Sequence, residues 1–159
     1  MLSISIHTSV HCAAPHTPET NGIIHLEKSS DDVYQNHVNG IDKDIPLGSL
    51  LTARCCFGTA AWNDMIYVVG GYNRGDCLNT IEAFDPLENQ WRFLPYSMAS
   101  RRGRVSVTIV NNKLYAFGGS DGQKELNTGE CFNLNSTNKW SPIKELSAPV
   151  AHGGKFDYQ

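Results

Sequence analysis

The chain has 159 residues, a length typical of one domain, and a formal net charge of −3. Hydrophobic residues make up 40% of the chain and charged residues 18%, which excludes a highly charged disordered protein. No apolar run approaches the roughly 18 residues that a membrane helix needs. The near-neutral charge argues against a nucleic-acid partner or an anionic membrane partner.

The N-terminal third differs in composition from the rest of the chain. Residues 1–45 carry six acidic and two basic side chains, and Tyr34 is the only one of the 15 aromatic residues among them. Their polar clusters show neither the period of a strand nor that of a helix, and they offer too little apolar surface to offset the entropy of ordering. We predict that residues 1–45 are a disordered or linker segment and that the folded domain covers residues 46–159.

The folded part contains an internal repeat. A shift of 48 residues superposes matching residues at many spaced positions, and after one inserted residue Trp91 matches Trp140 at a shift of 49. The matched pairs at a shift of 48 are Arg54 and Arg102, Tyr67 and Tyr115, Gly70–Gly71 and Gly118–Gly119, Glu82 and Glu130, and Phe84 and Phe132. We predict one repeat over residues 50–97, a second over 98–147, and the start of a third over 148–159.

Each repeat has the pattern of four short strands. Asn63–Asp64 and Asn111–Asn112 suit two-residue hairpin turns between the first two strands, because Asn and Asp tolerate a positive φ. The expected strands are Gly58–Trp62, Ile66–Gly70, Thr80–Asp85 and Gln90–Leu94 in the first repeat, and Arg104–Ile109, Leu114–Gly118, Thr128–Asn133 and Lys139–Ile143 in the second. Four strands at a period of about 50 residues indicate a β-propeller blade, so we predict an all-β fold with two four-stranded antiparallel blades and the start of a third.

The repeat resembles the kelch family. The double glycine after an apolar strand, the later Glu with its aromatic residue, and the final Trp match the kelch motif over about Leu50 to Ser147. Near Pro149 to Gln159 the pattern weakens, since Ala151–His152 stands near the place where Arg102 predicts a basic residue. The resemblance implies a partial kelch propeller, with about two of the roughly five to seven blades that a kelch ring needs, within the general range of 4–8.

The residues that recur in both repeats are expected to be structural. A glycine in a strand marks a close approach or an unusual φ, and repeated aromatic residues favour packing between blades over ligand stacking. A phosphate-binding loop is the alternative for the glycines, but neither nucleotide-binding glycine spacing is present. The expected structural residues are Arg54, Tyr67, Gly70, Gly71, Glu82, Trp91, Arg102, Tyr115, Gly118, Gly119, Glu130 and Trp140.

Strand direction places three segments at the same end of the blades. These are Tyr72–Cys77, Ser97–Arg104 and Ser120–Glu125, which we call the loop face. Arg101 and Arg104 have no counterparts in the first repeat, so they are candidates for specificity; the alternative is that they are solvated residues at the rim. In the kelch-like proteins that this chain resembles, this face receives partner peptides. Arg104 stands where some of them place an arginine that binds acidic peptides. The predicted partner-binding residues are Tyr72, Asn73, Arg74, Asp76, Arg101, Arg104, Ser120 and Asp121.

The sequence does not favour catalysis, a cofactor or a metal site. Some kelch propellers are copper oxidases, but no histidine lies between His37 and His152, and the His and Cys residues near the N-terminus fit no zinc spacing. We therefore expect no enzyme activity, with a propeller enzyme as the disfavoured alternative. Five cysteines and no export signal favour reduced thiols and a cytoplasmic location, with nuclear or cytoskeletal locations as alternatives.

The expected function is protein recognition. The resemblance implies the client-binding part of a cullin-3 ubiquitin-ligase adaptor. Such relatives contact cullin-3 through an N-terminal BTB domain, which a BACK domain accompanies. Neither domain is visible in this sequence. An actin-binding kelch scaffold is the alternative within the same class. The expected partners are therefore proteins, namely a client peptide, cullin-3 through a BTB domain, or actin.

A two-blade stack leaves strand edges and apolar blade faces uncovered. We therefore predict that the isolated chain is unstable or needs a partner. Thermal unfolding followed by circular dichroism, together with light scattering, tests this prediction. A cooperative unfolding transition of a monomer would contradict it.

Overall fold

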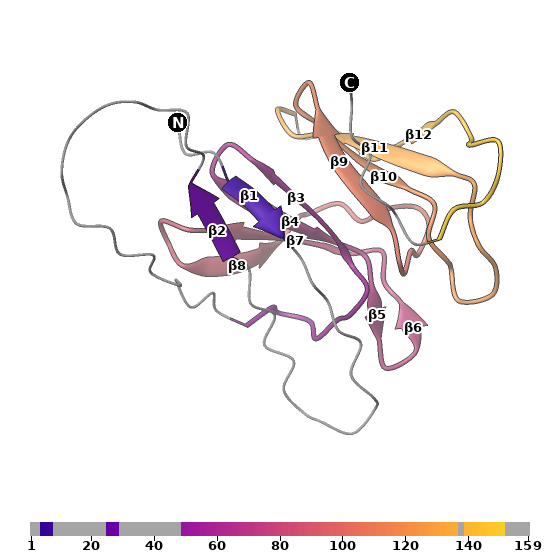
Figure 1. Ribbon diagram of the computed structural model, residues 1–159, viewed down its shortest axis with the longest axis horizontal. Helices are drawn as coiled ribbons and strands as arrows, with labels where there is room; N and C mark the ends of the chain where they lie inside the picture. The colour runs from indigo at the N-terminus through magenta and orange to yellow at the C-terminus, as the bar shows by residue number, and fades with distance from the viewer. Residues whose placement is uncertain (1–3, 8–24, 29–48, 137–138, 152–159) are drawn as a thin grey trace.

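The structure is a computed structural model, and it describes residues 4–7, 25–28, 49–136 and 139–151. The described residues form strands, turns and irregular segments, and none of them belongs to a helix (Figure 1). Accordingly, no helix in this part of the chain could cross a membrane. The strands are β1 (Ile4–His7), β2 (His25–Lys28), β3 (Gly58–Trp62), β4 (Met65–Val69), β5 (Tyr72–Asn73), β6 (Asp76–Cys77), β7 (Ile81–Asp85), β8 (Gln90–Phe93), β9 (Ser106–Val110), β10 (Lys113–Phe117), β11 (Gly129–Asn133) and β12 (Ser141–Ile143).

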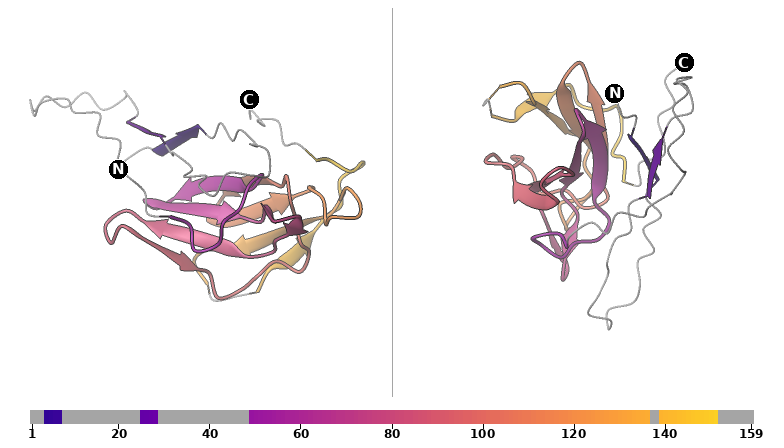
Figure 2. Two further views of the ribbon diagram at one scale, coloured as in Figure 1. Left: turned by 90° about the horizontal axis from the view of Figure 1, so that it is seen from below. Right: turned by 90° about the vertical axis from the view of Figure 1, so that its left-hand side faces the viewer.

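Two four-stranded antiparallel sheets form the body of the molecule. The first has the strand order β3-β4-β7-β8, and the second has the corresponding order β9-β10-β11-β12. The sheets lie against each other with the first strands β3 and β9 side by side (Figures 1 and 2). The predicted fold class, an all-β partial propeller with two blades, is therefore confirmed; we call the sheets blade 1 and blade 2.

The hairpin turns form where the sequence places them. Asn63 and Asp64 have φ values of 51° and 61°, and Asn111 and Asn112 have φ values of 49° and 60°. These left-handed conformations match the right-handed twist of the strands on both sides. Each turn joins two strands in the expected register, with Trp62 opposite Met65 in blade 1.

Most strand bounds lie within one residue of the expected ones, and three differences are larger. β9 begins at Ser106 instead of Arg104, because Arg104 has a φ of 54° and cannot continue an extended strand. β12 covers only Ser141–Ile143, so Trp140 precedes the strand. The segment expected to be a polar loop after Gly71 forms the short hairpin β5–β6, whose turn has positive φ at both Arg74 and Gly75.

One strand pair lies in the segment expected to be a linker. β1 and β2 pair antiparallel, and β1 lies close to β3 of blade 1. The prediction for residues 1–45 did not include this pair. The other residues of that segment lie outside the described part of the chain.

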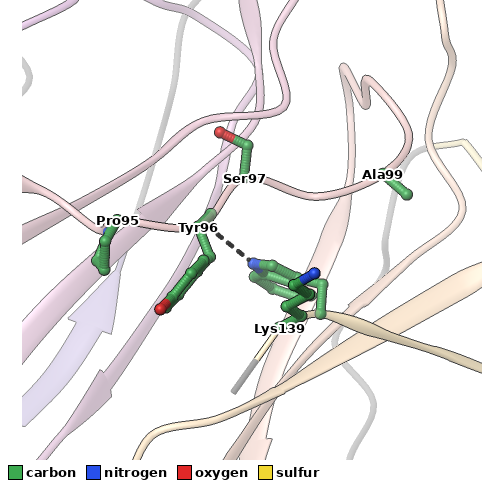
Figure 3. A pocket seen from close by; sticks show the side chains of 6 residues that line it. Pro95, Tyr96, Ser97, Ala99 and Lys139 are labelled. Atoms are coloured by element: carbon green, nitrogen blue, oxygen red, sulfur yellow. Dashed lines mark hydrogen bonds between the residues drawn. The ribbon is translucent and has the colours of Figure 1, made fainter. Parts of the chain in front are cut away.

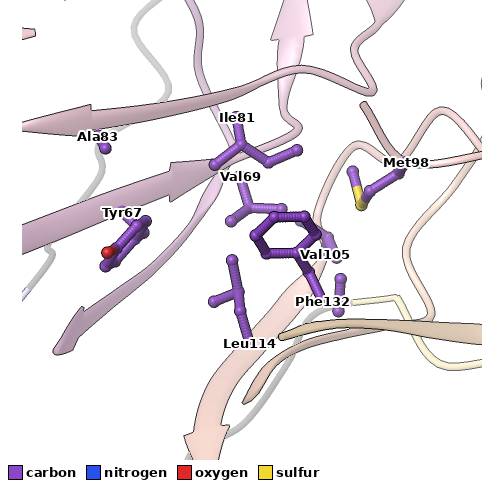
Figure 4. Close-up of a cluster of buried hydrophobic side chains, with 9 residues drawn as sticks. Tyr67, Val69, Ile81, Ala83, Met98, Val105, Leu114 and Phe132 are labelled. Carbon is purple, nitrogen blue, oxygen red and sulfur yellow. The ribbon is translucent and has the colours of Figure 1, made fainter. Parts of the chain in front are cut away.

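The core lies between the two blades. Alternate residues of blade 1 point toward blade 2, and those of blade 2 point back, as period-2 strands require (Figure 4). The buried residues are Tyr67, Val69, Ile81 and Ala83 from blade 1, Leu114, Ala116 and Phe132 from blade 2, and Met98 and Val105 from the segment that joins the blades. Because this cluster takes side chains from both blades, the blades stabilise each other.

The double glycines sit where two segments of chain meet. Gly71 has a φ of 100°, and a Cβ atom there would lie 2.7 Å from the backbone oxygen of Cys55. Gly75 has nearly the same φ of 97°, yet a Cβ atom there would meet nothing within 4 Å. The two glycines therefore share a backbone requirement and differ in packing.

We predict that Gly71→Ala destabilises the fold more than Gly75→Ala does. Both substitutions strain the backbone, but only Gly71→Ala also forces a methyl group against packed chain. This overlap should lower the free energy of unfolding by about a further 1–3 kcal/mol. Chemical denaturation of both variants measures the difference. Equal losses would show that φ alone explains the glycine at position 71.

Candidate interaction surface at the loop face

A buried arginine fixes the start of blade 1. Nη1 of Arg54 donates to the backbone oxygens of Gly70 (2.9 Å) and Thr80 (3.1 Å), and Nη2 donates to Glu82 Oε1 (2.5 Å). Glu82 is fully buried and also accepts the backbone N–H groups of Leu51 and Thr52. Burial lowers the pKa of the Arg54 guanidinium, and the neighbouring charge of Glu82 opposes this shift.

Blade 2 repeats this arrangement. Arg102 donates to the backbone oxygens of Gly118 (2.8 Å) and Thr128 (2.9 Å) and pairs with Glu130 at 3.0 Å. Glu130 accepts the backbone N–H groups of Ala99 and Ser100, at 2.6 and 3.1 Å. The segment that joins the blades, residues 94–105, is thus tied to blade 2 by a buried charged pair; we call it the linking segment.

The path of the linking segment repeats after blade 2. Met98 N–H donates to the Asn79 oxygen, and 48 residues later Leu146 N–H donates to the Asn127 oxygen. Gly71 N–H donates to the Arg102 oxygen, and Gly119 N–H donates to the Val150 oxygen, both at 2.8 Å. Val150 therefore occupies the position that Arg102 has in the second repeat. The sequence had suggested Ala151–His152 for this position, and His152 lies outside the described residues.

The structure gathers part of the predicted loop face around Gly103. Gly103 pairs with Ser120 across an isolated bridge, with N···O distances of 2.8 Å in both directions. The ring of Tyr72 covers Gly103 so closely that a Cβ atom there would lie 2.1 Å from the ring. Tyr72 and Ser120, which come from different blades, thus flank the same backbone position of the linking segment.

The two non-repeated arginines differ in their surroundings. Arg101 is exposed, yet its Nη1 donates to the backbone oxygen of Cys77 at 3.1 Å. Arg104 is half-buried at a positive φ, and its N–H donates to the Cys56 oxygen at 2.8 Å. Both residues therefore join the linking segment to blade 1.

The remaining predicted residues divide between the hairpin and the second loop. Arg74 and Asp76 are exposed on the β5–β6 hairpin, and Asn73 is half-buried there. Ser120 is buried and its hydroxyl accepts from Gly122 N–H, while Asp121 Oδ1 accepts the N–H groups of Gln123 and Lys124. These backbone hydrogen bonds lower the pKa of Asp121, so its carboxylate shapes the turn.

A hollow lies on the other side of the linking segment. Its volume is about 330 Å³, and its lining consists of Pro95, Tyr96, Ser97, Ala99, Lys139 and Trp140 (Figure 3). Trp140 Nε1 donates to the backbone oxygen of Tyr96, and the Trp140 ring lies 5.5 Å from that of Phe132. The structure therefore places Trp140 in contact with the linking segment between the blades.

Sequence reasoning missed several residues of this junction. Tyr96 and Met98 pack between the blades, and Trp62 Nε1 donates to Asn112 Oδ1 of the other blade at 2.9 Å. None of these residues recurs with the same identity in the other repeat, so the repeat pattern gave no signal for them. Across the residues that the structure describes, no three His, Cys, Asp or Glu side chains lie close enough to hold a metal ion.

The kelch motif model matches residues 53–98 and 101–147. The chain is 31% identical over 109 residues to the Influenza virus NS1A-binding protein homolog of Mus musculus, covering 69% of this chain and 15% of that protein. It is 30% identical over 109 residues to the Influenza virus NS1A-binding protein of Homo sapiens, with the same two shares. It is also 35% identical over 89 residues to Kelch-like ECH-associated protein 1B of Danio rerio, covering 54% of this chain and 15% of that protein. The chain thus spans about a seventh of the length of these relatives.

We predict that Arg102→Ala destabilises the fold by about 3–5 kcal/mol, because it leaves the buried Glu130 carboxylate without its charged partner. Denaturant unfolding measures the loss. Arg92→Ala, on the exposed face of β8, is the control and should change stability by no more than about 0.5 kcal/mol. A loss for Arg102→Ala as small as that of the control would contradict the assigned role of the pair.

Proposed function

Because the chain belongs to the kelch-repeat family and is a protein-interaction module, we propose that it is the client-binding part of a cullin-3 ubiquitin-ligase adaptor. Its partner would be an acidic peptide segment of a client protein. The cullin-3 assignment rests on the resemblance to adaptors of this family, and the surface assignment rests on the loop face.

One observation carries the surface assignment. Segments from both blades and from the linking segment meet around Gly103, and this region carries the guanidinium groups of Arg74, Arg101 and Arg104. Loops held by a rigid frame are suited to binding, and arginines form bidentate hydrogen bonds with carboxylates. Acidic side chains of a client peptide therefore suit the arginine donors of this face, between the carboxylates of Asp76 and Asp121.

Charge reversal tests the surface. We expect the double variant Arg101→Glu and Arg104→Glu to bind acidic peptides on an array at least about 10-fold more weakly than the unmodified chain, because two attractive charges become repulsive. The matched control is Arg92→Glu with Lys113→Glu, which makes the same change in net charge on exposed positions away from the loop face. Equal losses in both double variants would contradict a specific site.

A separate experiment tests the adaptor role. Transcript sequence upstream of Met1 should encode a BTB domain, and the protein made from that transcript should bind purified cullin-3. The 159-residue chain should bind the acidic peptides without binding cullin-3. Failure of the BTB-containing protein to bind cullin-3, together with co-sedimentation of the chain with filamentous actin, would instead favour the actin-scaffold function.

A further inference from the structure

We propose that the β5–β6 hairpin is a preformed recognition finger, that Arg74 at its tip contacts the partner, and that Arg101 positions the hairpin. This inference deepens the proposed function and rests on it for the acidic nature of the partner. It assigns different roles to two arginines of the loop face, since Arg74 contacts the partner and Arg101 positions the hairpin.

The hairpin is built to hold one conformation. Tyr72 pairs with Cys77 and Asn73 with Asp76, and the turn between them has φ values of 50° at Arg74 and 97° at Gly75. Two positive φ values are the requirement of the tight hairpin turn whose twist matches the strands. Leu78 N–H donates to the Gly71 oxygen at 2.8 Å and closes the base.

Three contacts from outside the hairpin fix its base. Tyr72 exchanges backbone hydrogen bonds with Cys55, at 3.0 and 2.8 Å, and its ring lies on Gly103. Cys77 is buried, and its backbone oxygen accepts from Arg101 Nη1. The base of the hairpin is therefore held from both sides, whereas the tip residues Arg74, Gly75 and Asp76 are exposed.

Arg74 has the chemistry of a contact residue. Within the described part of the chain its side chain has neither a hydrogen bond nor an ion pair, so its guanidinium donors face solvent. A guanidinium carries five N–H donors in a planar fork that matches a carboxylate. On a rigid hairpin this fork binds an acidic side chain without a further cost for ordering the loop.

The corresponding loop of blade 2 is held in a different way. The position that corresponds to Arg101 after blade 2 is Pro149, which has no side-chain donor, and the position that corresponds to Cys77 is Glu125. The loop there, Ser120–Glu125, keeps the bridge between its first and last residues and a hydrogen bond from Asp121 N–H to the Lys124 oxygen at 3.2 Å, and the Asp121 carboxylate also holds its turn. The arginine tie thus belongs to the hairpin of blade 1, whereas the Asp121 side chain holds the turn of the corresponding loop in blade 2.

Amide hydrogen exchange of the full chain tests the positioning role. We expect Arg101→Ala to speed exchange at the Asp76, Cys77 and Leu78 amides by about 3- to 10-fold, which is the range for losing one hydrogen bond. Arg101→Lys, which keeps a donor, should restore part of the protection. Arg92→Ala is the control, and the β4 amides should stay protected in every variant. Unchanged exchange at the hairpin in Arg101→Ala would overturn the positioning role.

Binding of a fluorescein-labelled hexaglutamate peptide tests the contact role. Arg74→Asn removes the guanidinium and keeps a residue that tolerates positive φ. We expect it to weaken binding at least about 5-fold with unchanged hairpin exchange, and unchanged affinity would overturn the assignment. Weaker binding by Arg101→Ala without faster exchange would make Arg101 a contact residue. If the unmodified chain fails to bind the peptide, the proposed acidic partner is wrong, and the exchange data still decide the positioning role.

Discussion

The buried arginine–glutamate pair is the interaction on which this architecture depends. In each blade one guanidinium reaches two backbone oxygens and a carboxylate, and the carboxylate receives two N–H groups from the segment that enters the blade. A buried charge is costly when it lacks a partner, so the pair tolerates only one path for the incoming chain. That path fixes the start of the first strand and, with it, the register of the sheet.

The loop face follows from the same constraint. Because Arg102 holds the linking segment in place, its neighbours Arg101, Gly103 and Arg104 are held at one end of the two blades. The ring of Tyr72 then packs on Gly103, which brings the hairpin of blade 1 against the linking segment. The surface that we propose for binding is therefore an extension of the element that stabilises the fold.

The repeated part of this structure could be predicted from the sequence, and the non-repeated part could not. The turns at Asn63–Asp64 and Asn111–Asn112 and the strands beside them follow from local residue preferences and from the 48-residue shift. The β5–β6 hairpin and the β1–β2 pair follow from contacts between distant residues. The bond from Arg101 to Cys77 spans 24 positions and occurs once, so no internal comparison could reveal it.

Val150 has a consequence for the junction after blade 2. Its backbone repeats the hydrogen bonds of Arg102, but a valine side chain cannot supply the charged donors. At the junction after blade 2 the main-chain bonds of Val150 are joined by a side-chain bond from Asn127 to Glu145, whereas each of the two earlier junctions contains a buried charged pair. The linking segment around Gly103 should therefore open less readily than the chain at Val150. The loop face is thus built on a junction that a buried charged pair stabilises.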